Sequence, residues 1–403
     1  MENDGRLGGA DFMRAVACLM VLVHHLVLRM DFNKLPPSLE TSFIVARFGN
    51  YGVAVFFVLS GFLLSRPFWL ALDRGEPLPS MKVYAIRRAA RIMPGFWFAL
   101  TIGFLISFTV YDFTLDGELV GRYIAGFFLM SQWHWRTFFP VQGDGPLWSI
   151  PFETTCYLLL PIGFLLLFHS KLGSRSALPG RLLWVGIIAA ALVGHWLVVT
   201  SFPTDSVGRG WQYGFQGGAK EWMPRYNPIG FFAVFAIGAL AAGVQTIIPS
   251  RRMAIYDVIA ALAIVLGAWQ LPRSIGGDWE GYAWLGIPYQ FPFLPLAVAI
   301  ALCTLPQSRL LANLLDNSLT RYIATVSFGV YIWQDIVLTL MPRLVPSSFG
   351  SGTDDVLGGW AISSLIATAV IFTIGTLSYV LLERPVIRWA RTRESKNMRP
   401  ATT

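Results

Sequence analysis

The feature that most limits the possible folds of this chain is its first apolar segment, residues 11–30, which reads DFMRAVACLMVLVHHLVLRM. About 20 predominantly apolar residues are enough for a helix to cross the hydrocarbon core of a bilayer. The segment nevertheless carries Arg14, His24 and His25. Ionisable side chains within a membrane helix are rare and usually functional, because their insertion is costly. The segment therefore predicts a membrane helix with a functional site along it.

Helical geometry separates the two histidines. At about 100° per residue, His25 returns to nearly the same side of the helix as Arg14, whereas His24 lies about 80° away. Arg14 and His25 are then roughly 16 Å apart along the axis, about half of the hydrocarbon thickness. We therefore expect Arg14 and His25 to act on one face and His24 to pack against a neighbouring helix.

The composition of the whole chain is typical of a membrane protein. Of its 403 residues, 55% are hydrophobic and 13% are charged, which is too apolar for one soluble core. The formal net charge of +8 indicates basic loops that face anionic lipid, and nucleic-acid binding is not expected. The cysteines lie inside apolar runs, which disfavours disulfides and thiolate metal sites: Cys18, Cys156 and Cys303. No metal site is predicted.

Apolar runs of about 20 residues predict an all-α, polytopic membrane protein with about ten transmembrane helices, at residues 11–30, 47–67, 92–111, 147–168, 182–200, 228–248, 253–271, 286–304, 321–342 and 359–382. A shorter run, residues 123–130, is expected in the interface. An even number of spans places both termini on one side. That side carries twenty Lys and Arg residues against ten in the opposite loops, so the positive-inside rule predicts cytoplasmic termini. Residues 1–389 are expected to form one transmembrane domain, and residues 390–403 a polar, disordered cytoplasmic tail.

This orientation allows the depths of buried charges to be compared. The first run leads outward and the fourth leads inward, so His25 and Glu153 each lie about 7 Å outside the middle of their helix. A histidine and a carboxylate at one depth can form the pair that general base catalysis needs. The alternative is that each satisfies a different partner. Ser60, in the middle of the second run, is expected to serve helix packing, because a serine nucleophile needs an adjacent base that the sequence does not predict.

The densest cationic cluster, RRAARIMP, places Arg87, Arg88 and Arg91 immediately before the third run. One interpretation is a plain positive-inside anchor. The other is a phosphate site, because arginines offer bidentate donors at a helix N-terminus. The sequence alone leaves both open.

Two exterior segments, residues 112–147 and 201–228, combine aromatic and polar residues, among them Trp133 and His134. Interfacial aromatic belts explain part of this composition, and a binding surface for a sugar ring would explain the rest. The ninth run adds Tyr331, Gln334 and Asp335 inside the membrane, of which Asp335 is a candidate partner for a cation. Glu383 and Arg384, at the inner interface, are expected to form a local ion pair.

Together these motifs resemble the acyltransferase 3 family of integral membrane acyltransferases, from residue 11 to about residue 389. The resemblance rests on Arg14 and His25 with ten residues between them, and on GVAVFFVLSGFLL, RRAARIMP, LWSIPFETTCYLLLP, SFGVYIWQ and LLERP, in that order. It implies an O-acyltransferase of the bacterial inner (cytoplasmic) membrane. Such an enzyme moves an acyl group, most often acetyl from acetyl-CoA, to a hydroxyl of an extracytoplasmic glycan or lipid-linked saccharide.

The resemblance also implies residue roles. His25 matches the family's essential histidine and Arg14 its partner, Glu153 and Trp148 match the motif of the fourth run, and the three arginines before the third run match the cytoplasmic arginine motif. A substrate-binding set is expected from Trp148, Tyr331, Gln334, Trp133 and His134. The family often has histidine where this chain has Gln334, so a mechanism that needs two histidines is in doubt.

The resulting hypothesis is that acyl-CoA, a substrate rather than a tightly bound cofactor, docks its phosphates on Arg87, Arg88 and Arg91. His25, oriented by Glu153, then activates the acceptor hydroxyl or briefly carries the acyl group. The alternative is a proton-coupled transporter or flippase that uses the intramembrane charges as a relay. A third reading, a structural subunit of a surface-polymer assembly, leaves the buried charges unexplained.

Overall fold

The computed structural model describes residues 7–170, 177–202, 219–220, 222–249, 251–271 and 281–397. Within these ranges the chain is built from helices, and the only β-type pairing is an isolated bridge between Met253 and Ser308. The predicted all-α fold is therefore confirmed. Most of the second exterior segment, residues 201–228, lies outside the described residues.

Each of the ten expected apolar runs coincides with a helix. In the described chain, eight helical segments are long and apolar enough to cross a membrane. Their main helices are α1 (Ala10–Val27), α3 (Gly52–Asp73), α4 (Met81–Thr109), α6 (Ser149–His169), α7 (Ala177–Ser201), α9 (Pro228–Ile247), α13 (Ser318–Leu344) and α14 (Val356–Ser378). The two other runs form shorter apolar helices, α10 (Ala254–Trp269) and α11 (Phe293–Thr304).

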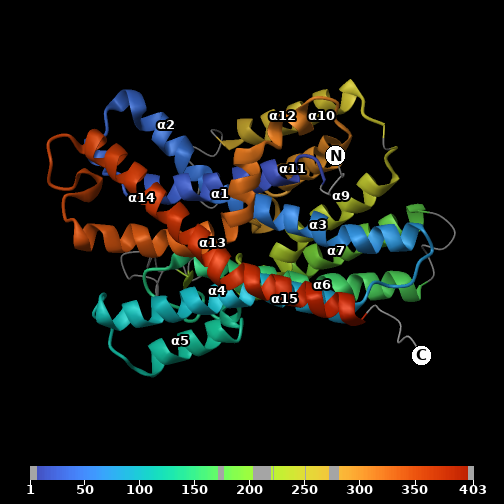
Figure 1. Cartoon of the computed structure of the whole chain (residues 1–403), viewed down its shortest axis with the longest axis horizontal. Helices are drawn as coiled ribbons and strands as arrows, with labels where there is room; N and C mark the ends of the chain where they lie inside the picture. The colour runs from blue at the N-terminus through green and yellow to red at the C-terminus, as the bar shows by residue number, and fades with distance from the viewer. Residues whose placement is uncertain are drawn as a thin grey trace.

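The remaining helices connect or extend these. They are α2 (Pro37–Arg47), α5 (Gly117–Phe127), α12 (Leu311–Leu315) and α15 (Arg384–Asn397), with short 3₁₀ turns that include η2 (Phe48–Tyr51) and η4 (Gly145–Trp148). The expected interfacial run overlaps α5. A π-helical turn, Tyr379–Glu383, joins α14 to α15, so the two form one long helical run across the molecule (Figure 1). Part of the expected disordered tail is instead helical, because α15 continues as far as Asn397.

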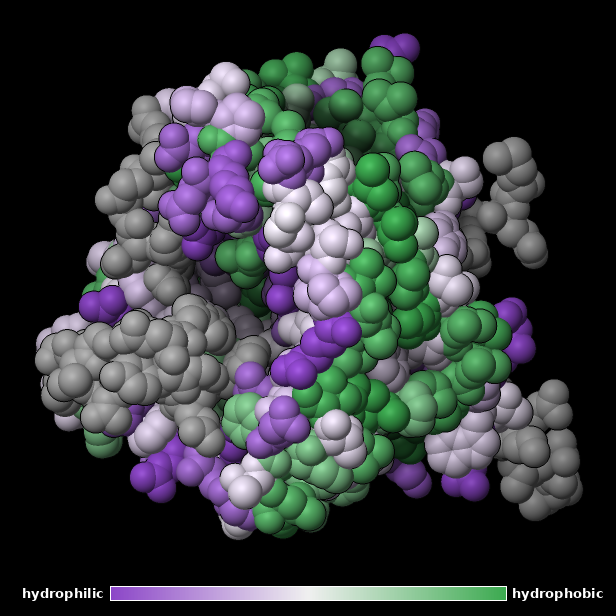
Figure 2. All heavy atoms as spheres, turned by 90° about the vertical axis from the view of Figure 1, so that its left-hand side faces the viewer, coloured by the Kyte–Doolittle hydropathy of each residue, from purple (hydrophilic) through white to green (hydrophobic). Residues whose placement is uncertain are grey.

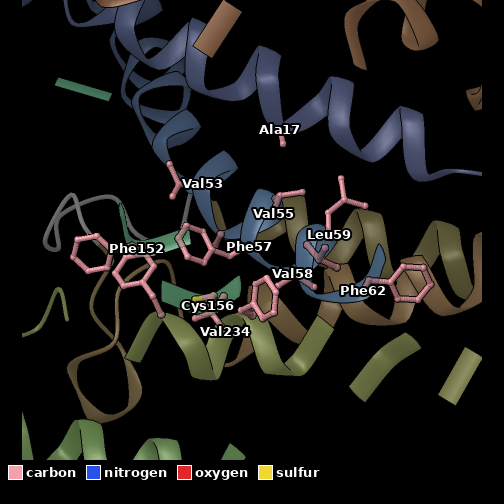
Figure 3. Packing of buried hydrophobic residues seen from close by; sticks show 14 of the residues in the cluster. Ala17, Val53, Val55, Phe57, Val58, Leu59, Phe62, Phe152, Cys156 and Val234 are labelled. Carbon is pink, nitrogen blue, oxygen red and sulfur yellow. The ribbon is translucent and has the colours of Figure 1, made fainter. Parts of the chain in front are cut away.

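Helix α3 lies at the centre of the packing, with α1 on one side and α6 and α9 on the other. Figure 3 shows Phe57 and Val58 of α3 beside Cys156 of α6 and Val234 of α9, with Ala17 of α1 on the opposite side. The contact with α9 depends on glycine. A Cβ on Gly61 would lie 2.0 Å from the carbonyl oxygen of Phe235, so only a residue without a side chain permits this approach.

The outer helices present apolar side chains to their surroundings, as lipid-facing helices do. On α7 the exposed residues include Leu182, Val185, Val193 and Leu197, and on α14 they include Ile362, Leu365 and Ile366. Figure 2 looks onto the face at the left of Figure 1, where hydrophilic residues gather beside a broad hydrophobic band. The chain is therefore a multi-pass membrane protein whose polar groups are concentrated inside and at its ends.

Candidate active site

A polar cavity of about 110 Å³ lies among α1, α3, α4, α6 and α13. Its apolar wall includes Val53, Phe56, Phe57, Ile92 and Phe328. Its polar lining consists of Arg14, Ser60, Arg88, Arg91, Ser149, Glu153, Tyr157, Ser327 and Tyr331. The cavity thus brings together residues from five helices that the sequence separates by as much as 317 positions, from Arg14 to Tyr331.

Three arginines form the cationic part of this cavity, and they differ in their partners. Arg91 donates to the Oε2 atom of Glu383 at 3.0 Å, and the Glu383 side chain is fully buried. Arg14 and Arg88 have neither a hydrogen bond nor an ion pair with any described residue. The expected local pair of Glu383 with Arg384 is therefore wrong, because the π-helical turn directs Glu383 toward α4.

The predicted arginine site needs one correction. Arg88 and Arg91, three residues apart on α4, share one face of the helix and line the cavity. Arg87 lies about 100° around the helix from Arg88; it is exposed and does not line the cavity. Its place in the cluster is taken by Arg14, which comes from α1.

Glu153 lines the cavity and is held by two hydroxyl groups. Its Oε1 atom accepts from Ser60 Oγ at 2.7 Å and from the Tyr157 hydroxyl at 2.5 Å. Tyr157 follows Glu153 by one helical turn, so both project from the same face of α6. The carboxylate is therefore fixed in position, and its second oxygen has no partner among the described residues.

The predicted pair of His25 with Glu153 is wrong. His25 Nδ1 lies 2.8 Å from the carbonyl oxygen of Val21 in its own helix, and the charged groups that act on its ring are Asp335 and Arg29. Glu153 is on α6, on the far side of α3 from α1. Glu153 meets Ser60 of α3 and shares a cavity with Arg14, whereas His25 lies in the field of Arg29 and Asp335, so the two side chains belong to different sites.

The contact with Val21 has a chemical consequence for His25. Because the carbonyl oxygen only accepts, Nδ1 must carry the hydrogen, and the neutral ring then has a free electron pair on Nε2. Among the described residues, Nε2 has no hydrogen-bond partner. His25 thus has the tautomer that a general base needs.

His24 has a different role, as the helical phase predicts. Its Nδ1 atom is hydrogen-bonded to the carbonyl oxygen of Arg47 at the end of α2. This contact ties α1 to α2, as expected for a histidine that packs against a neighbouring helix.

Asp335 belongs to a charged cluster at the C-terminal end of α1, which the positive-inside rule predicts to be the outer end. Arg29 donates to Asp335 Oδ1 at 3.1 Å, and the backbone N–H of Gly145 donates to Oδ2 at 2.8 Å. The prediction that Asp335 pairs with a cation is therefore confirmed. Asp144, next to Gly145, is fully buried and neither of its carboxyl oxygens has a hydrogen-bond partner in the described chain. Burial, and then the neighbouring Asp335, raise the pKa of Asp144 well above its usual value.

The predicted substrate residues lie in three different surroundings. Tyr331 lines the cavity and its hydroxyl is 2.6 Å from Ser149 Oγ, while Gln334 is buried one turn away with its Oε1 atom unpartnered among the described residues. Trp148 is packed among other rings, including Phe138 at 5.4 Å between centroids. Trp133 and His134 are exposed on the loop after α5.

Sequence reasoning did not predict the contacts of three residues in this arrangement, among them Ser60, which was expected only to serve helix packing. Tyr157 carried a usable signal, because it follows Glu153 by four positions. Arg29 and Ser60 carried none, since their partners lie on α13 and α6 and depend on how the helices pack.

Comparison with known proteins gives the chain a family context. The acyltransferase 3 model, described as an acyltransferase domain, matches residues 7–382. The chain is 23% identical over 384 residues to the peptidoglycan O-acetyltransferase OatA of Listeria monocytogenes, covering 93% of this chain and 55% of that protein. It is 24% identical over 401 residues to the acyltransferase MdmB of Streptomyces mycarofaciens, covering 95% of this chain and 92% of that protein.

The chain therefore spans about half the length of OatA and most of the length of MdmB. No solved structure matches it.

Proposed function

The chain belongs to the acyltransferase 3 family, and from this premise we propose that it is a membrane O-acyltransferase of the bacterial cytoplasmic membrane. It moves an acyl group, acetyl in the first instance, from cytosolic acyl-CoA to a hydroxyl of a cell-envelope glycan or lipid-linked saccharide. The names of OatA and MdmB support the class of reaction, and that of OatA supports a cell-wall glycan as the acceptor.

The observation that carries the proposal is the polar cavity itself. Arg14 and Arg88, which have no hydrogen bond or ion pair with any residue that the structure describes, line a space inside an apolar bundle together with the carboxylate of Glu153. Unpaired cations are costly at such a depth. A polyanionic substrate such as acyl-CoA, with several phosphates and a long uncharged arm, would supply the missing partners.

In this proposal the donor binds at the cationic part of the cavity. Arg88 and Arg91, near the start of α4, hold the phosphates through charge-assisted hydrogen bonds. The pantetheine arm then runs past Arg14 toward Glu153. Glu383 fixes the direction of Arg91.

The acceptor hydroxyl is activated at the outer end of α1. His25 removes its proton through Nε2, and Asp335 stabilises the imidazolium that forms. Helix α13 connects this region with the cavity, because Tyr331 of the cavity lies one turn from Asp335. His25, with Asp335 in place of Glu153 as its acidic partner, is thus the residue that activates the acceptor.

The decisive experiment measures acetyl-CoA consumption by the purified protein with and without candidate glycans. We expect CoA release to depend on the glycan, and mass spectrometry to detect base-labile acetyl esters on the product. The same esters should be absent from the surface glycans of a deletion strain. Flux of a glycan precursor across vesicles without CoA turnover would instead favour the transporter hypothesis.

A further inference from the structure

Ser60 makes a contact that distinguishes it from other buried serines of the bundle. Ser65, further along α3, donates to the carbonyl oxygens of Phe62 and Ala239. Ser107 and Ser327 donate to carbonyl oxygens of their own helices. These contacts satisfy a hydroxyl in an apolar environment without chemistry. Ser60, by contrast, donates to a carboxylate.

The carboxylate partner has the geometry of a general base. Ser60 Oγ lies 2.7 Å from Glu153 Oε1, within the range needed for proton transfer. Tyr157 donates to the same oxygen and holds the carboxylate in place. A serine hydroxyl becomes a useful nucleophile when a base lies within hydrogen-bond distance and a third group orients that base. Ser60, Glu153 and Tyr157 meet this description.

The pair also lies where the acyl group has to pass. Ser60 and Glu153 line the cavity together with the arginines proposed for the donor and with Tyr331, which leads toward the acceptor side. Gly61, the next residue of α3, packs against the backbone of α9. Because consecutive residues point about 100° apart, this packing fixes α3 with Ser60 turned toward α6.

From these observations we infer that Ser60 carries the acyl group as a covalent ester between donor and acceptor. Ser60 Oγ attacks the thioester carbon while Glu153 takes its proton. The tetrahedral intermediate collapses, the C–S bond breaks, and Glu153 returns the proton to the CoA thiolate. Arg14, on the same cavity wall, stabilises the oxyanion. In the second half-reaction the acceptor hydroxyl attacks the Ser60 ester, and Glu153 takes over at Ser60 the proton removal that direct transfer assigns to His25. Glu153 gives this proton to Ser60 Oγ as the bond between the acyl carbon and the serine oxygen breaks, which releases the acylated acceptor and regenerates the serine.

The inference rests on the proposed acyl transfer from acyl-CoA, and the experiment separates the two. The purified wild-type protein is incubated with radiolabelled acetyl-CoA without acceptor, quenched in acid and digested for mass spectrometry. We expect one acetyl ester on the peptide that contains Ser60, and we expect added glycan acceptor to remove it. The His25→Ala variant should form the same ester in the absence of acceptor, because Glu153 and not His25 is the base beside Ser60.

The Ser60→Ala variant should lose both the label and about 100-fold or more of the transfer rate. Ser65→Ala is the matched control on the same helix, outside the cavity lining, and it should label and transfer like the wild type. Ser60→Cys keeps a nucleophile at this position and should take up the label as a thioester, which shows that the site still folds.

Two results would overturn the inference while leaving the proposed function intact. One is transfer by Ser60→Ala at the wild-type rate. The other is glycan acetylation by a wild-type protein that never shows label at Ser60, including the case in which the label appears on His25. A wild-type protein that neither takes up label nor consumes acetyl-CoA would overturn the proposed function as well.

Discussion

The two ends of α1 present their charges in opposite ways. At the N-terminal end, which is the inner end in the predicted topology, Arg14 and the neighbouring Arg88 face a cavity and have no ion-pair partner among the described residues. At the C-terminal end, which is the outer end in the predicted topology, Arg29 is paired with Asp335, and His25 lies in the field of both. One membrane helix therefore carries an open cationic site and a closed, neutralised cluster.

The difference indicates what each end does. An unpaired cation inside a helix bundle is unfavourable unless a bound anion pairs with it, so the inner end is suited to binding an anion. A paired cluster holds its members in fixed positions and favours reaction geometry over binding. Substitutions at the inner end should therefore change donor affinity, and those at the outer end should change turnover.

The largest expected effect is at the outer end. His25→Ala should lower kcat by about 10²- to 10⁴-fold, the usual contribution of a general base. His24→Ala, which removes only the contact with the carbonyl oxygen of Arg47, should leave most of the activity. Glycan-dependent CoA release measures both. If instead His24→Ala abolished glycan-dependent CoA release and His25→Ala did not, the functional face assigned to α1 would be wrong.

Asp335→Asn should lower kcat by about 10- to 100-fold, because interactions with charged groups are worth about 1.5 to 3 kcal/mol and each 1.4 kcal/mol is a factor of ten. The substitution keeps the shape of the side chain but removes the charge that stabilises the imidazolium. KM for acetyl-CoA should not change, since the donor binds at the other end of α1. A higher KM with normal kcat would show that the two ends are not functionally separate.

Arg88→Gln should raise KM for acetyl-CoA about tenfold with little change in kcat, as expected when ground-state and transition-state binding are lost equally. Arg87→Gln is the matched comparison, since it removes the same charge from the exposed side of α4. Steady-state kinetics over a range of acetyl-CoA concentrations distinguish them. Equal effects of the two variants would mean that general basic charge, rather than the cavity, attracts the donor.

The sequence predicted the helices well because the length of an apolar run determines whether it can cross a membrane. The helical phase also predicted different surroundings for the two histidines of α1, and His24 is hydrogen-bonded to the carbonyl oxygen of Arg47 while His25 lies in the field of Asp335 and Arg29. The sequence failed for Glu153 and His25, because the packing of the helices decides which side chains meet. Glu153 meets Ser60 of α3, and His25 lies in the field of Arg29 and Asp335. The close approach of α3 to α9 at Gly61, which helps to set this arrangement, does not follow from one helix alone.

The smallest expected effect concerns Asp144, the buried neighbour of the outer cluster, and it appears in stability. The pKa of Asp144 is raised well above its usual value by burial and by Asp335. The folded protein therefore holds a proton that the unfolded chain releases near pH 4. Folding must take up this proton at higher pH, so the wild type loses stability as pH rises from the unfolded pKa to the folded one.

Asp144→Asn has no proton to take up at this position. The melting temperature of the variant minus that of the wild type should therefore increase as pH rises from about 5 to 8, by a few degrees at most. Thermal unfolding in detergent measures this difference. Thr109→Val, which removes an exposed hydroxyl at the end of α4, should show no such trend. A difference between Asp144→Asn and wild type that stays constant with pH would mean that Asp144 is ionised in the folded protein. Asp144 and Asp335 would then both carry a negative charge beside Arg29. The two ends of α1 would differ in net charge as well as in whether their charges are paired.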